Sequence, residues 1–301
     1  MAAEKGGDLS RIFREDGSYD YKDFNHFLNV YEAATSVLQG PEDFARMTRA
    51  VLEESAANGV VYTEAFISPD FCGGGDVGAG REYLQAMIET SAQAEGELGI
   101  TMRGVITCIR HFGPEQAKTA AICAAETAGD WITGFGMGGD EMPGKPGDFA
   151  WSFDCARAAG LDITVHAGEW GGATSVRDAL DALRPSRIGH GVQAIDDLAL
   201  VDRLAEDGVV LEVCPGSNVF LGVYPSLDKH PIEKLRERGV LVTISTDDPP
   251  FFHTTMNKEY ENLARVFQWD EEDFAALNQV ALDAAFCDAA TRDRIRERLT
   301  R

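Results

Sequence analysis

The sequence predicts a parallel α/β fold, and three observations carry this prediction. Short β-branched runs follow helical patterns repeatedly, at residues 57–66, 97–109, 158–167, 206–215 and 237–248. A glycine stands between each helical pattern and its run, which is where a helix usually ends. The runs are largely apolar, which indicates strands that are buried on both faces of a sheet.

Two further strands are expected at 130–137 and 186–192, which makes seven in all. Helical periodicity predicts helices between the strands, at 41–55, 83–95, 114–126 and 196–206. Extra C-terminal helices are expected at 258–286 and 291–299, packed around the sheet. A closed barrel needs eight strands, so a barrel and an open doubly wound sheet both remain possible on this count. No Gly-rich phosphate-binding motif follows any of the strands.

Length and charge narrow the class of protein. The 301 residues have no linker-like composition break, so one domain over 1–301 is expected. The formal net charge of -23 opposes binding to nucleic acid or to anionic membrane surfaces. The six cysteines are scattered without a CxxC pair, and no apolar run approaches the roughly 18 residues of a membrane span. A cytoplasmic protein with reduced thiols is therefore expected.

Polar side chains follow five of the predicted strands, at the point where each strand ends. They are Gly139-Asp140-Glu141, His166 with Glu169, His190, Ser217-Asn218, and Asp247-Asp248. Because the carboxyl ends of parallel strands meet at one face of the fold, these groups are expected to lie together. Two imidazoles and an aspartate suit a divalent metal, and a nearby glutamate suits a proton donor. Together these groups indicate metal-assisted hydrolysis.

Each group also has an ordinary structural explanation. His190 between two glycines could cap a strand, the aspartates at 247–248 could belong to a turn, and Asp140 with Glu141 could be a solvated pair. Four other histidines have no partner at a meaningful spacing and are expected to be ordinary: His26, His111, His230 and His253. The recurrence at five strand ends is what favours a site.

Four motifs resemble the adenosine and adenine deaminase family of the amidohydrolase superfamily. They are HAGE at 166–169, RIGHGV at 187–192, EVCPGSN at 212–218 and TISTDDP at 243–249. GFGMGGDE at 134–141 and Ser-Pro-Asp at 68–70 are similar to that family too. The resemblance runs in order from about residue 10 to about residue 285. It implies a (β/α)8 TIM-type barrel with one catalytic zinc ion.

The resemblance also implies a reaction, the hydrolytic loss of ammonia from C6 of an aminopurine base or nucleoside. Adenosine is favoured as substrate, with adenine as the alternative. His166 and Asp247 would be metal ligands, and His190 would orient the attacking water and help to remove its proton. Glu169 would protonate the ring nitrogen beside C6. Asp248 would hold the imidazole-side ring nitrogen, and the Gly139 amide would meet the pyrimidine side.

One departure from the family pattern is large. The family's first strand ends in His-x-His, which supplies two further metal ligands, and this sequence contains no HxH. The predicted strand at 57–66 corresponds to the family's second, so the barrel is expected to lack its first strand. Either an N-terminal segment is missing, or the chain is a catalytically dead purine-binding relative. A missing segment is favoured, because a protein without catalytic activity would have no need of Glu169, His190 and Asp248.

Two consequences follow from this departure. With only His166 and Asp247 left of the usual ligands, tight zinc binding is not expected of the chain as it stands. The other zinc deaminase architecture, with its HxE and PCxxC signature, is excluded because both motifs are absent.

Overall fold

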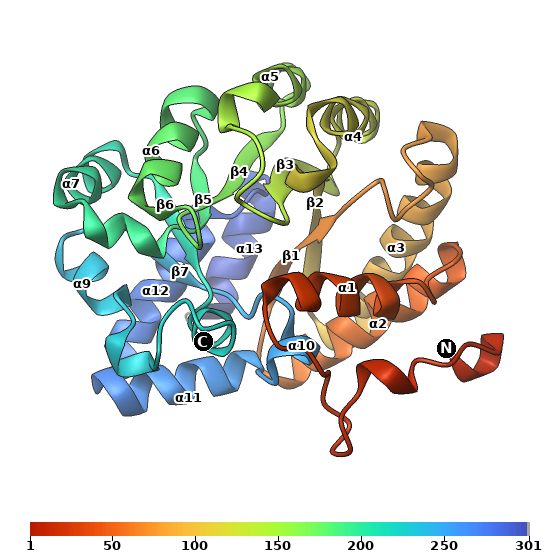
Figure 1. Cartoon of the computed structure of the whole chain (residues 1–301), viewed down its shortest axis with the longest axis horizontal. Helices are drawn as coiled ribbons and strands as arrows, with labels where there is room; N and C mark the ends of the chain where they lie inside the picture. The colour runs from red at the N-terminus through yellow and green to blue at the C-terminus, as the bar shows by residue number, and fades with distance from the viewer. Residues whose placement is uncertain (300–301) are drawn as a thin grey trace.

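The computed structural model describes residues 1–299 and contains one curled sheet of seven parallel strands (Figure 1). The strands are β1 (Tyr62–Ile67), β2 (Thr101–Ile109), β3 (Ile132–Gly138), β4 (Asp162–Ala167), β5 (Arg187–His190), β6 (Val210–Val213) and β7 (Val242–Ile244). They pair in chain order from β1 to β7, without a reversal. A doubly wound sheet reverses its strand order, so that alternative is wrong. The TIM-type fold with one strand fewer than eight is confirmed.

Helices surround the sheet on its outer side (Figure 1). The α-helices are α1 (Phe24–Thr35), α2 (Pro41–Ala57), α3 (Val77–Leu98), α4 (Pro114–Thr127), α5 (Ala150–Ala158), α6 (Gly172–Leu183), α7 (Leu198–Asp207), α8 (Pro215–Phe220), α9 (Ile232–Glu237), α10 (Pro249–Phe252), α11 (Met256–Phe267), α12 (Glu271–Ala284) and α13 (Ala289–Leu299). Short 3-10 turns occur at Ala3–Lys5, Ser10–Ile12, Arg110–Phe112, Pro146–Phe149, Val192–Asp196 and Leu227–Lys229. Within residues 1–299, no helix is long and apolar enough to cross a membrane.

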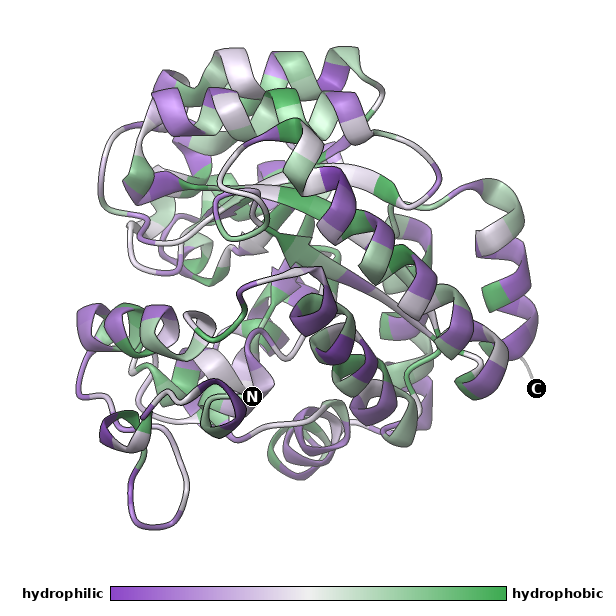
Figure 2. Cartoon of the chain, turned by 90° about the vertical axis from the view of Figure 1, so that its right-hand side faces the viewer, coloured by the Kyte–Doolittle hydropathy of each residue, from purple (hydrophilic) through white to green (hydrophobic). Residues whose placement is uncertain are grey.

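The sequence pattern of helix, glycine and strand has a clear backbone basis. α3 ends at Gly99 and α7 at Gly208, both in the left-handed conformation that glycine adopts without strain. The strands that follow these two helices, β2 and β6, are buried, with Val105 and Leu211 fully inaccessible to solvent. In Figure 2 the strands lie in the middle of the molecule and are largely green, which marks apolar residues.

The amino-terminal end of the barrel interior is filled by a buried ion network. Arg187 at the start of β5 lies 2.6 Å from a Glu64 oxygen and 2.7 Å from a Glu212 oxygen. The Phe286 ring lies 3.3 Å from the centre of the guanidinium group. Gly134 leaves room for this ring, since a Cβ there would lie 2.6 Å from a Phe286 carbon. The two carboxylates offset the cost of burying the guanidinium charge. The network lies at the end of the barrel interior that is opposite to the polar strand ends.

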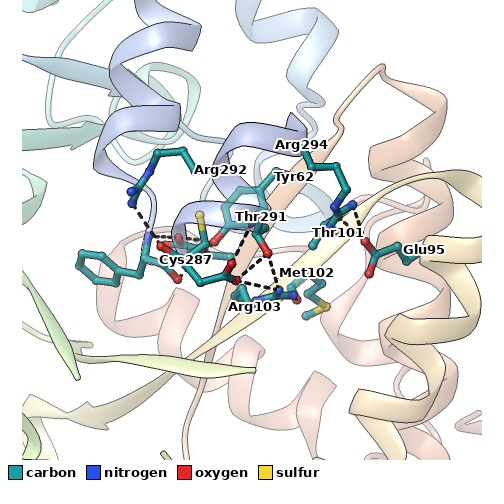
Figure 3. Close-up of polar contacts among 12 residues, drawn as sticks. Tyr62, Glu95, Thr101, Met102, Arg103, Cys287, Thr291, Arg292 and Arg294 are labelled. Carbon is teal, nitrogen blue, oxygen red and sulfur yellow. Dashed lines mark hydrogen bonds and ion pairs between the residues drawn. The ribbon is translucent and has the colours of Figure 1, made fainter. Parts of the chain in front are cut away.

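The C-terminal helices contact strands on opposite sides of the curled sheet. α12 packs on β7, and α13 lies over the start of β2 (Figure 3). Arg103 donates to the Thr291 hydroxyl at 3.1 Å, and Arg294 donates to Thr101 and pairs with Glu95 (Figure 3). The predicted packing of these helices around the sheet is thus confirmed up to Leu299. The last two residues of the chain lie outside the described range.

Candidate functional site

The predicted strand-end groups meet at the carboxyl end of the sheet. His166 lies in β4, His190 ends β5, and their rings make an edge-to-face contact with centroids 5.1 Å apart. Nε2 of His190 lies 3.8 Å from Oε2 of Glu169 and 3.9 Å from Oδ2 of Asp247. The structure therefore brings four of the expected site residues together. Asp248 begins the turn into α10 beside them.

Two of these residues have strained backbones. His190 has φ of 62° and Asp247 has φ of 58°, in the left-handed region that non-glycine residues rarely adopt. Such a conformation costs about 1–3 kcal/mol, and it persists only where the surrounding structure imposes it. Strain at both strand ends is what a functional site often shows.

Burial changes the protonation of the acidic groups. The Glu169 side chain is only 8% exposed, and burial, followed by the negative charge of Asp247, raises its pKa to about 8. Burial and the Asp247 carboxylate also raise the pKa of Asp248 well above its usual range. Glu169 therefore carries a proton at neutral pH in the metal-free protein and can donate it in a hydrogen bond, and the environment of Asp248 favours its protonated form as well.

Glu141 is buried and not part of a solvated pair, in contrast to one of the sequence-based explanations. Its carboxylate accepts backbone N–H groups from the loop after β4: those of Gly168, Glu169, Trp170 and Gly171. Although burial acts to raise the pKa of Glu141, the hydrogen bonds that its carboxylate accepts lower it below its usual value. A charged Glu141 thus holds the loop that carries Glu169.

Gly139 follows β3 at the same end of the sheet. Its φ is 89°, and a Cβ there would lie 2.8 Å from Nδ1 of His111. The same Nδ1 atom accepts the backbone N–H of Asp140 at 3.1 Å. His111, expected to be an ordinary histidine, thus packs against the loop that Gly139 begins.

Sequence reasoning placed Ser217 and Asn218 among the strand-end groups without giving them a role, and it missed His230. Ser217 donates to Oδ2 of Asp247 at 2.7 Å. Nδ2 of Asn218 lies 3.1 Å from Nδ1 of His190, and Oδ1 of the same amide lies 3.2 Å from Nε2 of His230. His230 was expected to be ordinary, but it is buried and reaches the site through Asn218. The EVCPGSN motif contained the signal for Ser217 and Asn218, whereas nothing in the sequence pattern marked His230.

The chemistry of the donor atoms fits a divalent metal ion. One potential ligand atom from each of His190, Cys214 and Asp247 lies within 4.8 Å of the other two. Nδ1 of His166 is buried without a hydrogen-bond partner. Imidazole, thiol and carboxylate groups are the ligand types that zinc prefers. Cys214 is the potential ligand that the sequence-based set omitted.

Aromatic side chains from α1 cover the site. Phe24 packs on Trp170, next to Glu169, with ring centroids 5.6 Å apart. Phe27 and Tyr31 pack on Phe251, three residues after Asp248, with centroids 5.5 and 5.3 Å apart. α1 therefore extends from the Glu169 loop to the turn of Asp248, and Figure 1 shows it beside α10. We call these three α1 residues, Phe24, Phe27 and Tyr31, the aromatic cap.

Known proteins resemble this chain over nearly its full length. The family model for adenosine deaminase matches residues 9–301. The adenine deaminase of Rhizobium johnstonii is 46% identical over 300 residues, which cover 99% of this chain and 92% of that protein. The adenine deaminase of Rhizobium rhizogenes is 47% identical over 291 residues, with 96% and 90% covered.

Two crystal structures share the fold. Adenine deaminase from Arthrobacter aurescens superposes with a TM-score of 0.90 at 29% identity, covering 99% of this chain and 91% of that one. An amidohydrolase from B. ambifaria, which has bound Zn, superposes with a TM-score of 0.80 at 26% identity, covering 90% and 77%.

Proposed function

This chain belongs to the adenosine deaminase family, and from that premise we propose that it is a hydrolytic deaminase of free adenine. The sequence alone favoured adenosine, with adenine as the alternative. The alternative is the better supported, because relatives that match over nearly the full chain at 46–47% identity are named adenine deaminases. The observation that carries the proposal is a protonated Glu169 beside His190 and Asp247, at the end of the barrel where this fold places its chemistry.

The protonated carboxyl groups suit the nitrogens of a purine. Glu169 donates its proton to the ring nitrogen beside C6, so that the carbon becomes more electrophilic. Asp248, whose pKa is also raised, donates a hydrogen bond to the imidazole-side ring nitrogen. The amide of Gly139 meets the pyrimidine side. These roles follow the family pattern and are supported by the raised pKa values of the two acids.

A zinc ion is the proposed cofactor, and His166 and Asp247 would hold it. When bound, zinc lowers the pKa of its water toward about 7, which supplies a nucleophile at neutral pH. Ser217 orients the Asp247 carboxylate through its hydroxyl. Nε2 of His190 lies between Glu169 and Asp247, where it would face the attacking water.

The aromatic cap supports a base without a sugar. The cap stands on the side of the site where Asp248 lies, because Phe27 and Tyr31 pack on Phe251 in the short helix that follows Asp248. The negative charge of Asp248 is the first cause of the raised Tyr31 pKa, ahead of burial. We infer that these packed rings leave room for a free base and would have to move to admit a ribose. Free adenine needs no such opening.

The test compares adenine, adenosine and adenosine monophosphate as substrates of the zinc-supplemented protein, with ammonia release as the readout. We expect turnover of adenine with kcat/KM at least about 100-fold above that for adenosine. Glu169→Gln serves as the control for contaminating activity, because it removes the proposed proton donor. Equal or preferred turnover of adenosine would contradict the substrate. Adenine binding without ammonia release from any substrate would instead favour the dead purine-binding protein.

A further inference from the structure

A chain of hydrogen bonds begins at the backbone of α9 and ends in the site. The N–H of Ile232 donates to Nδ1 of His230 at 3.2 Å. A backbone N–H can only donate, so Nδ1 of His230 carries no proton, and the neutral ring holds its proton on Nε2. The ring is buried, and burial lowers the pKa of His230 to about 3, which keeps it neutral.

The proton on Nε2 sets the orientation of the next side chain. Nε2 of His230 lies 3.2 Å from Oδ1 of Asn218, which accepts from it. The amide nitrogen of Asn218 must then point the other way. It lies 3.1 Å from Nδ1 of His190 and 3.5 Å from Oε1 of Glu169. Asn218 is fully buried, so no water competes for these positions.

The same logic reaches His190. The Asn218 amide nitrogen is a donor only, so Nδ1 of His190 must accept from it and cannot carry a proton. The neutral His190 ring therefore has its proton on Nε2. That nitrogen lies 3.8 Å from Glu169 and 3.9 Å from Asp247, in the space between the two carboxyl groups.

We propose that His230 and Asn218 are positioning residues that hold His190 in the Nε2–H tautomer, so that it presents a hydrogen-bond donor to the space between Glu169 and Asp247. This inference deepens the proposed function and rests on it for the part that concerns catalysis. It refines the expectation that His190 helps to remove a proton from water. In the neutral tautomer proposed here, Nε2 has no free lone pair with which to accept that proton.

The substitution Asn218→Asp tests the proposal with little change in shape. An aspartate accepts from both histidines, so Nδ1 of His190 gains a donor role and its proton moves from Nε2 to Nδ1. The ¹⁵N shifts of the ring nitrogens report this directly in ¹⁵N-histidine-labelled protein, because the chain has only six histidines to assign. We expect Nε2–H in the unaltered protein and Nδ1–H in the variant. The kcat for adenine should fall about 10–100-fold, with KM changed much less.

A second pair of variants protects the test against misfolding of Asn218→Asp. His230→Gln keeps an N–H donor that can reach Asn218, and it should retain the His190 tautomer and most of the activity. His230→Phe keeps a ring of similar size without the donor, and it should lose both. If His190 carries its proton on Nδ1 in the unaltered protein, or if both His230 variants leave its spectrum unchanged, the positioning role is wrong.

The two proposals fail in different ways. The ring spectra need no substrate, so a protein that deaminates nothing but shows the expected tautomers would contradict only the proposed function. An active adenine deaminase with the opposite His190 tautomer would contradict only the positioning role.

Discussion

The backbone N–H of Glu169 donates to the carboxylate of Glu141 at 3.0 Å, so one buried glutamate holds another. Their pKa values shift in opposite directions, above the usual value for Glu169 and below it for Glu141. Burial dominates at Glu169, whereas hydrogen bonds to the charged form prevail at Glu141. When the surroundings shift the pKa values of two similar acids apart in this way, the two acids usually have different roles. Here Glu169 is the proposed proton donor, and Glu141 holds the loop in place.

The first prediction concerns Glu169 as proton donor. Glu169→Gln keeps the shape of the side chain but has no acidic proton, so turnover should fall about 10²–10⁴-fold while zinc content stays the same. Ammonia release and metal analysis on the same samples check this. Turnover within a fewfold of the unaltered protein would remove Glu169 from the mechanism.

The same variant has a stability signature in chelator-treated protein. A raised folded-state pKa means that the unfolded chain loses its proton first, so stability falls as pH rises from about 4.5 to about 8. Glu169→Gln removes this loss, which amounts to at most about 3 kcal/mol at pH 7. Thermal melting at pH 5 and pH 8 should therefore show a smaller pH dependence in the variant.

The second prediction concerns Glu141 as anchor. Its lowered pKa stabilises the fold above about pH 4.5, and that contribution is lost as pH falls through the folded-state pKa. Glu141→Gln replaces one acceptor oxygen with a donor, which leaves loop N–H groups unpaired and should cost about 1–3 kcal/mol at pH 7. Urea unfolding measures the loss, with Glu115→Gln on the exposed surface as the control. Equal stabilities of the two variants would contradict the anchor role.

The third prediction separates the two adjacent aspartates. Asp247→Asn weakens a proposed ligand while tolerating the left-handed backbone, so zinc affinity and activity should fall together, by at least about tenfold. Asp248→Ala should retain zinc and weaken adenine binding by about 1–3 kcal/mol, because the ring nitrogen loses its partner. Metal analysis after dialysis and equilibrium binding of adenine distinguish them. Identical metal loss in both variants would show that the division is wrong.

The fourth prediction concerns the aromatic cap. Tyr31→Ala removes the ring that packs on Phe251 and should lower the ratio of adenine to adenosine kcat/KM by about tenfold or more. Tyr83→Ala is the matched control, because it removes a ring that packs on Phe44 between α2 and α3. A ratio that is unchanged in both variants would mean that the cap does not select the substrate.

The strand-end residues were predictable because each directly ends a strand. Once the strands are parallel and pair in order, His166, His190 and Asp247 must converge, whatever the details of the loops. The order of helices and strands was predictable as well, because the pattern of helix, glycine and strand involves only residues that are close together in the sequence. A doubly wound sheet was left open only because strand count alone does not distinguish it from a barrel.

The rest depended on contacts that leave no local pattern. Glu141 looked like half of an exposed acidic pair, and its role comes from N–H groups 27 to 30 residues away. His230 reaches the site through Asn218, 12 residues earlier and across a loop without periodicity. The aromatic cap joins α1 to α10, which lie more than 200 residues apart. Such partners follow from the folded geometry and not from spacing.

The last prediction tests why β5 has a glycine beside His166. Gly189 pairs with His166 across the strands, and a Cβ at Gly189 would lie 2.7 Å from Nδ1 of the imidazole. The backbone there suits any residue, so Gly189→Ala should fold but push the ring out of position. Because a ligand displaced by even 1 Å loses its geometry, zinc affinity should fall at least about tenfold, and activity with it. Competition with a chromophoric chelator measures the affinity.

Gly96→Ala is the control, because a Cβ there meets nothing within 4 Å, and alanine in the interior of α3 should raise stability by about 1 kcal/mol. Unchanged zinc affinity in Gly189→Ala would mean that His166 does not need this space, and its assignment as a metal ligand would lose its main structural support.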